Sequence, residues 1–205
     1  MRVILTAVDG DLHDAWRNHC GHFDFVSIVQ GSILETPATA VVSPANSFGF
    51  MDGGIDAAYT RHFGEHVETR VQRTIKDDYD GELLVGQAIV VTTGNKAIPY
   101  LIAAPTMRVP MRLPADTVNP YLAAKAAILC AKRLNEMLKV YTGDPKAVPI
   151  TSVAFPGMGT GVGGLDPERC AAQVAQAIQD TLVMQPMYPY SWQDAVYRHQ
   201  ELSGG

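Results

Sequence analysis

Short apolar runs alternate along the chain with longer segments in which apolar residues recur every three or four positions. The short runs are rich in β-branched residues, as strands are, and the longer segments have the spacing of amphipathic helices. We predict strands at residues 3–8, 23–29, 38–43, 87–92, 100–104 and 150–155. We predict helices at residues 11–20, 55–71, 117–138 and 167–183, with Gly64 placed to divide the second, and a short helix in the last twenty residues.

This alternation predicts an α/β fold, a three-layer α/β/α sandwich whose central sheet is mostly parallel. A length of 205 residues favours one domain. We expect residues 1–185 to form that domain and residues 186–205 to be a C-terminal tail packed on it. The aromatic side chains of Tyr188, Tyr190 and Trp192 are expected to pin this tail to the body.

The charge balance limits the partners of the chain. It carries 16 Lys and Arg against 21 Asp and Glu, a net charge of −5, which argues against binding duplex DNA because no excess of basic groups is there to neutralise phosphates. A small phosphorylated ligand is still allowed, since backbone N–H groups can hold a phosphate. The widely spaced Cys20, Cys130 and Cys170 predict reduced thiols. No cleavable leader and no uncharged stretch of about 20 residues is found, so we expect a cytoplasmic protein without membrane contact.

A glycine-rich loop is the densest chemical signal. Between Pro156 and Asp166 it carries five glycines after a predicted strand and before a proline-started helix, where backbone amides can surround an anion. The alternative is a loop that is merely flexible. Residues 159–164 match G-x-G-x-x-G, but no strand ending in an acidic residue follows, and the lysine of a phosphate-binding P-loop is missing.

A second loop, residues 43–56, also joins a predicted strand to a helix, so it should lie at the same edge of the sheet. Its Asn46 can both donate to and accept from a sugar hydroxyl, and Gly53 and Gly54 allow a close backbone approach. Asp56 falls in the first helical turn, where the helix dipole is expected to keep it ionised near neutral pH. The alternatives are an asparagine that satisfies a turn and an ordinary N-terminal helix acid.

Together these segments resemble the macro domain, an ADP-ribose-binding family. The segment VSPANSFGFMDGGIDAAY stands where the family has N-A-A-N, a glycine run and V-D. The segment from Ala154 to Gly164 is similar to the family's second loop, and QGSIL at residues 30–34 is similar to its Q-G-D-I. The resemblance covers residues 23–184 and implies a mixed, mostly parallel sheet with the ligand along its carboxyl edge.

The resemblance also implies a function and a set of site residues. It implies binding of ADP-ribose and hydrolysis of an ADP-ribosyl linkage on a modified protein or nucleic acid, with no cofactor and no metal. The implied catalytic residues are Asn46 and Asp56. The implied ligand-binding residues are Ser32, Ile33, Ala45, Gly53, Gly54, Ile55, Gly157, Met158, Gly159, Thr160, Gly161, Val162 and Gly163. The alternatives are a reader that binds ADP-ribose without turnover and, more remotely, a partner-binding scaffold.

Four departures from the family pattern bear on the ligand. Ser32 replaces an acid that accepts from the adenine amino group, and Asp52 follows Met51 where the glycine run should begin. Gly163 stands in place of an aromatic residue that packs on the distal ribose, which favours a ligand role for Phe48 or Phe50. Residues 103–105 lack the family's histidine. His62 and His66 have a spacing that can bind zinc on one helix, but no third ligand is evident.

Overall fold

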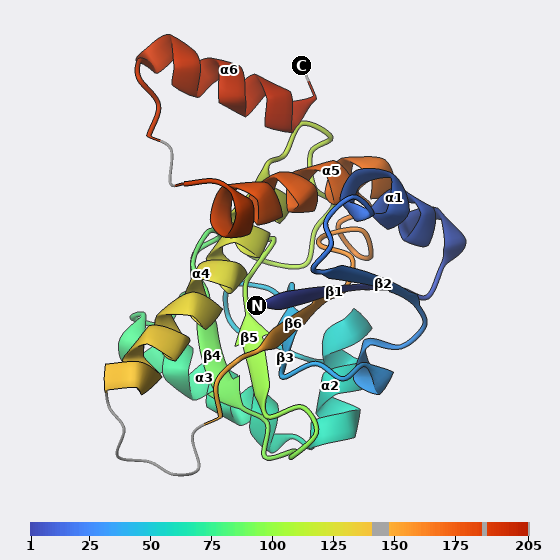
Figure 1. Cartoon of the computed structure of the whole chain (residues 1–205). Coiled ribbons are helices and arrows are strands. Elements are labelled where there is room, and N and C mark those ends of the chain that lie inside the picture. Colours follow the sequence, from blue (N-terminus) through green and yellow to red (C-terminus); the bar gives the residue numbers. More distant parts are fainter. Residues whose placement is uncertain (141–147, 186–187, 205) are drawn as a thin grey trace.

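Six strands form one mixed sheet in the order β2-β1-β6-β3-β5-β4 (Figure 1). The structure is a computed structural model that describes residues 1–140, 148–185 and 188–204. The strands are β1 (Arg2–Ala7), β2 (Val26–Gln30), β3 (Ala40–Ser43), β4 (Ile89–Thr92), β5 (Tyr100–Ala103) and β6 (Ser152–Phe155). Neighbouring strands run parallel except β4, which is antiparallel to β5.

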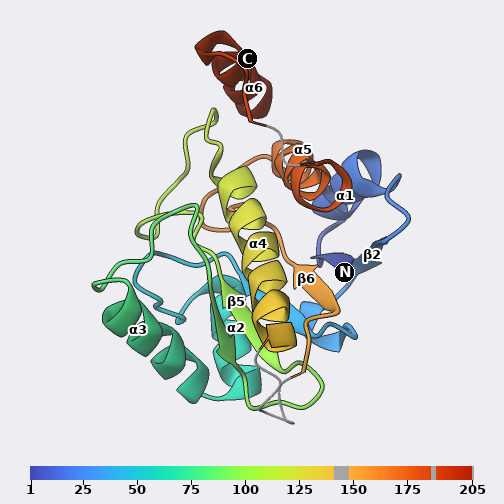
Figure 2. The same ribbon diagram turned by 60° about the vertical axis from the view of Figure 1, so that its left-hand side comes forward.

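Helices cover both faces of the sheet. They are α1 (Gly10–Cys20), α2 (Gly54–Phe63), α3 (His66–Asp78), α4 (Asn119–Val140), α5 (Pro167–Ile178) and α6 (Trp192–Ser203), with a 3₁₀ turn η1 (Ile33–Glu35) and a π turn η2 (Gln179–Val183). Helices α1, α4 and α5 lie on one side of the sheet and α2 and α3 on the other (Figures 1 and 2). Successive strand side chains point to opposite faces, so Val3 and Leu5 pack with the first group and Ile4 with the second. The predicted three-layer sandwich with a mostly parallel sheet is confirmed.

Local signals explain where several helices begin and end. Asp9 Oδ1 accepts from the Leu12 amide at 2.9 Å and caps α1, and Asp166 caps α5 with Pro167 in its first turn. Gly64, at φ 98°, separates α2 from α3 as predicted. His62 and His66 therefore lie on different helices, so the histidine pair on one helix was a wrong expectation. In the described ranges no three His, Cys, Asp or Glu side chains gather as a metal site.

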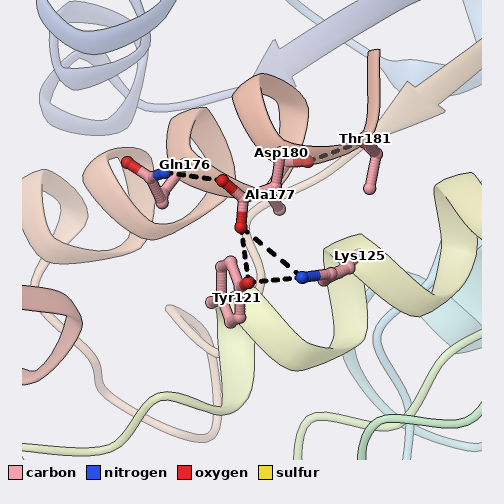
Figure 3. Close-up of polar contacts among 6 residues, drawn as sticks. All are labelled: Tyr121, Lys125, Gln176, Ala177, Asp180 and Thr181. Carbon is pink, nitrogen blue, oxygen red and sulfur yellow. Dashed lines mark hydrogen bonds and ion pairs between the residues drawn. The ribbon is translucent and has the colours of Figure 1, made fainter. Parts of the chain in front are cut away.

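A polar cluster joins α4 to the end of α5 (Figure 3). The Tyr121 hydroxyl donates to Asp180 Oδ2 at 2.6 Å, and Lys125 Nζ donates to the same hydroxyl at 2.6 Å. Gln176 Nε2 donates to the other oxygen of Asp180 at 2.7 Å. Burial, followed by the Asp180 carboxylate, raises the pKa of Tyr121. The cluster ties α4 to α5 and to the η2 turn that follows it.

The C-terminal tail touches the body through its last turn. Gln173 Nε2 donates to the Leu202 carbonyl at 3.0 Å, and no side chain of α6 is buried. Tyr188, Tyr190 and Trp192 are 88%, 94% and 79% exposed, so the expectation that they pin the tail was wrong. The tail is held by polar bonds at its far end, and its separation from residues 1–185 remains a prediction. Within the described part of the chain, no helix has the length and apolar character needed to cross a membrane.

Candidate functional site

A cavity of about 450 Å³ lies at the carboxyl edge of the sheet. The chain leaves β1 toward α1 on one face and leaves β3 toward α2 on the other, and β6 lies between these two strands. A crevice opens where strand connections diverge in this way. The predicted residues that line it are Ser32, Ile33, Ala45, Asn46, Gly53, Gly54, Ile55, Asp56, Gly157, Gly159, Thr160, Gly161, Val162 and Gly163.

Met158 is the one predicted ligand-binding residue that does not line the cavity. Its side chain is fully buried, and its amide donates to Cys170 Sγ at 3.3 Å. Burial raises the pKa of the Cys170 thiol to about 12, so this sulfur stays protonated. Met158 thus anchors the glycine-rich loop to α5, and its predicted contact with a ligand is not supported by its position.

The glycine-rich loop presents a run of unpaired backbone donors. Among the described residues, no acceptor is bonded to the amides of residues 157 and 159–163. The loop holds its shape through Gly164, whose amide donates to the Gly161 carbonyl at 3.0 Å, and Leu165, whose amide donates to the Gly159 carbonyl at 3.1 Å. Because buried or ligand-facing amides are normally paired, this run has the character of an anion site.

The glycines of this loop differ in what they would tolerate. A Cβ on Gly163 would lie 2.3 Å from the Gly159 carbonyl oxygen and 3.0 Å from Leu113. No side chain fits there, which explains why the aromatic residue of the family pattern is missing. A Cβ on Gly161 would meet nothing within 4 Å, and Gly161 does not have a positive φ.

Asn46 organises the loop that follows β3. Its Oδ1 accepts from the amides of Phe48 and Phe50 at 3.1 and 3.3 Å, and its Nδ2 donates to the Phe50 carbonyl at 2.9 Å. The side chain lines the cavity but is only 8% exposed. The turn-forming alternative is thus what the structure shows, and one N–H of the amide is left for a ligand.

The same loop is tied down further along. The Met51 amide donates to Glu68 Oε1 at 3.1 Å, and the Thr60 hydroxyl donates to the Met51 carbonyl at 3.1 Å. Phe50 is 57% exposed at the cavity wall, whereas Phe48 lies under the Arg108 guanidinium at 5.1 Å. Of the two phenylalanines, only Phe50 is placed to meet a ligand.

Asp56 lies in the first turn of α2 and is almost fully buried at the cavity wall. Burial raises its pKa from 3.8 to about 7; the Ser43 hydroxyl opposes this rise, and the carboxyl groups of Glu68 and Asp52 add to it. The expectation that the helix dipole keeps Asp56 ionised was wrong, because loss of water outweighs the dipole. Near neutral pH the group is divided between its two protonation states, as suits a general acid or base.

The wall formed by β1 and α1 was missed by sequence reasoning. It comprises Thr6, Ala7, Val8, Asp9 and Leu12, and further missed positions are Gly31, Pro44, Thr106, Met107, Pro110 and Pro156. Phe50 and Asp52, which the sequence had already singled out, also line the cavity. The Gly31 amide donates to the Ala7 carbonyl at 2.8 Å, so the ends of β1 and β2 lie side by side. Parallel pairing of the two predicted strands that became β1 and β2 could have revealed this wall.

Ser32 lies just after β2 and caps the η1 turn, where its hydroxyl accepts from the Leu34 amide at 3.3 Å.

Sequence relatives share most of this chain. A protein of Aquifex aeolicus is 33% identical over 154 residues, which are 75% of this chain and 81% of that protein. The O-acetyl-ADP-ribose deacetylase 1 of Pantoea vagans is 28% identical over 164 residues, covering 75% of this chain and 81% of its own length.

Solved structures share the fold. The macrodomain of Mycobacterium tuberculosis DarG matches with a TM-score of 0.58 and 27% identity, over 74% of this chain and 88% of that one. The Oceanobacillus iheyensis macrodomain with ADP matches with a TM-score of 0.55 and 22% identity, over 83% of this chain and 86% of that one. The family model of the macro domain matches residues 42–174, well over half of the chain. The two loops that line the cavity fall within that match, and the chain belongs to the macro domain family.

Proposed function

We propose that the chain binds ADP-ribose in the cavity at the carboxyl edge and hydrolyses an ADP-ribosyl linkage on a modified acceptor. Membership of the macro domain family implies ADP-ribose as the ligand. The Oceanobacillus iheyensis macrodomain, which shares the fold, was solved with ADP. In this proposal the amides of the glycine-rich loop hold the diphosphate, and the loop after β3 surrounds the distal ribose.

The run of unpaired amides at residues 159–163 carries the proposal. In the part of the chain that the structure describes, these five consecutive N–H groups have no acceptor, which leaves a concentrated set of donors on one wall. Hydrogen bonds to a charged acceptor contribute about 1.5–3 kcal/mol each, so a diphosphate would gain much of its binding free energy here. No basic side chain is needed for this, which agrees with the acidic balance of the chain.

Asp56, which lines the same cavity, supports the hydrolytic part of the proposal. Its ionised form would accept a proton from water as the water oxygen bonds to the anomeric carbon of the distal ribose and the bond to the acceptor breaks. A carboxylate beside that carbon also stabilises the positive charge that develops in the transition state. A pKa of about 7 leaves a substantial ionised fraction at neutral pH. The deacetylase name of the Pantoea vagans relative supports a hydrolytic role.

A reader without turnover is the second candidate, and the hydrogen bonds of Asn46 favour it. Its oxygen already accepts from two backbone amides, so it cannot also accept from a ribose hydroxyl unless the loop opens. A chain with the ribose less firmly oriented would still bind ADP-ribose through the glycine-rich loop.

Calorimetric titration with ADP-ribose, followed by turnover assays on ADP-ribosylated protein, ADP-ribosylated nucleic acid and O-acetyl-ADP-ribose, tests the proposal. Binding with release of ADP-ribose from at least one substrate is the expected result. Binding without release from any of the three selects the reader. Absence of binding removes both. The cytoplasmic location and the identity of the modified acceptor remain predictions.

A further inference from the structure

Two buried polar atoms beside the cavity have no partner among the described residues. They are Ser43 Oγ, at the carboxyl end of β3, and Asp56 Oδ1, in the first turn of α2. Their residues are 1% and 7% exposed. An unsatisfied buried polar atom destabilises a fold by about 1–3 kcal/mol, so two such atoms in one place require an explanation.

The packing of α2 on β3 brings these two atoms to the same interface. Tyr59, one turn after Asp56 on the same helix, donates its hydroxyl to the Val42 carbonyl at 2.9 Å. Val42 precedes Ser43 on the strand, so Asp56 and Tyr59 face consecutive residues of β3. Asp56 lines the cavity and Ser43 does not.

We propose that Ser43 is a positioning residue for Asp56, with its hydroxyl as the hydrogen-bond partner of the carboxyl in both protonation states. When Asp56 is ionised, the Ser43 hydroxyl rotates and donates to Oδ1. When Asp56 is neutral, its O–H donates to Ser43 Oγ. A hydroxyl can exchange these roles because it is both donor and acceptor, which an alanine could not do.

Other groups around Asp56 raise its pKa, whereas Ser43 lowers it. The carboxyl groups of Glu68 on α3 and Asp52 in the loop raise the pKa of Asp56, and the Tyr59 hydroxyl donates its proton to the Val42 carbonyl. Ser43 is the group facing Asp56 that favours ionisation. The serine therefore increases the fraction of Asp56 in the base form at neutral pH, against the larger effect of burial. Its catalytic consequence rests on the proposed function, but the hydrogen bond itself does not.

The titration of the Asp56 carboxyl by ¹³C NMR, assigned with Asp56→Asn, tests the pair without reference to activity. We expect Ser43→Ala to move the midpoint upward by about one pH unit or more, the equivalent of one hydrogen bond to a charged group. Ser43→Thr keeps the hydroxyl and should restore the wild-type midpoint. Ser47→Ala is the matched control, because Ser47 is also 1% exposed and does not act on Asp56.

Glu68→Gln should move the titration midpoint of Asp56 in the opposite direction. It removes a like charge but retains the oxygen that accepts from the Met51 amide, so the midpoint should fall. A loss of packing alone would not move the two variants in opposite directions. Where Ser43→Ala does not fold, Ser43→Cys keeps the volume with a weaker donor, and an upward shift is again expected.

Turnover gives the second readout. Below the midpoint, Ser43→Ala should lose about tenfold in kcat for each unit by which the midpoint rises, and should regain wild-type kcat above it. A midpoint in Ser43→Ala or Ser43→Cys equal to that of the wild type overturns the proposal. Shifted midpoints in a chain that turns over no substrate overturn the proposed hydrolysis and leave the Ser43–Asp56 pair standing.

Discussion

The two loops that enclose the cavity are built in opposite ways. The loop after β3 is held by side chains: Asn46 bonds the Phe48 and Phe50 backbone, and Glu68 bonds the Met51 amide. Among the described residues, the loop after β6 leaves the amides of residues 159–163 without a partner, and backbone bonds to the Gly159, Gly161 and Gly163 carbonyls hold its shape. One loop is held by side chains, and the other is held by its backbone carbonyls with its amides left free for a ligand.

Under the proposed function, this difference gives the two walls separate tasks. A loop fixed by buried side chains can place Asp56 within the tolerance that catalysis needs. A loop of unpaired amides gains most from an anion that supplies the missing acceptors. Changes in the loop after β6 should therefore act on affinity, and changes near Asp56 should act on turnover.

The largest effect is expected from Gly161→Glu. The added carboxylate would stand among the amides proposed for the diphosphate, and like-charge contacts cost several kcal/mol. We expect ADP-ribose affinity to fall roughly 100-fold or more by calorimetry, with the melting temperature little changed. Gly161→Ala is the control, because its Cβ meets nothing within 4 Å and should leave affinity near the wild-type value. Equal affinity in the glutamate variant would remove the diphosphate from this loop.

Asp56→Asn should separate the two tasks most clearly. We expect kcat to fall by roughly 100-fold, as for loss of a positioned acid–base group, with ADP-ribose affinity changed far less. Steady-state kinetics beside calorimetry measures both. A parallel loss of affinity and turnover would place Asp56 in binding instead.

The same variant makes a prediction about stability and pH. The pKa of Asp56 is about 7 in the folded chain and lower when unfolded, so the folded state holds more protons between about pH 4 and 7. The wild type should lose stability as pH rises through that window, by at most about 4 kcal/mol from this group. Asp56→Asn should remove that slope, so denaturant unfolding at pH 5 and pH 8 would show the variant gaining relative stability at the higher pH.

Asn46→Ala tests whether the loop after β3 is formed in advance. Removing three hydrogen bonds should lower the free energy of unfolding by about 1–3 kcal/mol and release Phe50 from its place. We expect affinity and turnover each to fall about tenfold, because ordering the loop then opposes binding. Asn46→Asp keeps the oxygen and loses the Nδ2 donor, and should be milder. Full activity in the alanine variant would show that the loop holds itself without this side chain.

The smallest effect is expected at Ser32, where the proposed function places the adenine. Ser32→Asp keeps the cap on the Leu34 amide and adds a charged acceptor for an exocyclic amino group. The gain of a charged over a neutral hydrogen bond is about 1 kcal/mol, or about fivefold in affinity for ADP-ribose relative to its guanine analogue. Ser32→Ala serves as the control. Strong wild-type discrimination that Ser32→Asp does not alter would place base recognition elsewhere.

Hydrophobic spacing was sufficient to predict the six strands, the main helices and both loops of the site. Strands β3 and β6 are short and buried on both faces, and each is followed by a loop rich in glycine. Gly64 and Asp166-Pro167 marked helix boundaries correctly because they act on the local backbone. These features depend on neighbours in the sequence, which is why they could be predicted.

The features that were missed depend on distant residues. The pKa of Asp56 is set by burial against β3 and by Glu68 on α3, and neither is visible in the local sequence. The hydrogen bond from the Met51 amide to Glu68 depends on how the loop after β3 lies over α3. The exposure of Trp192 in the tail depends on where α6 docks. Such properties arise from packing, and a sequence pattern does not specify packing in detail.

The central place of β6 has a consequence for synthesis of the chain. Arg2 of β1 pairs with Ser152 of β6, which also pairs with β3 at Ala40 through Val153. Until β6 has been made, β1 and β3 expose apolar strand edges that invite pairing with other chains. Contacts this remote in sequence also form slowly. A ribosome must therefore complete about three quarters of the chain before the sheet can close, and the nascent protein depends on protection from aggregation until then.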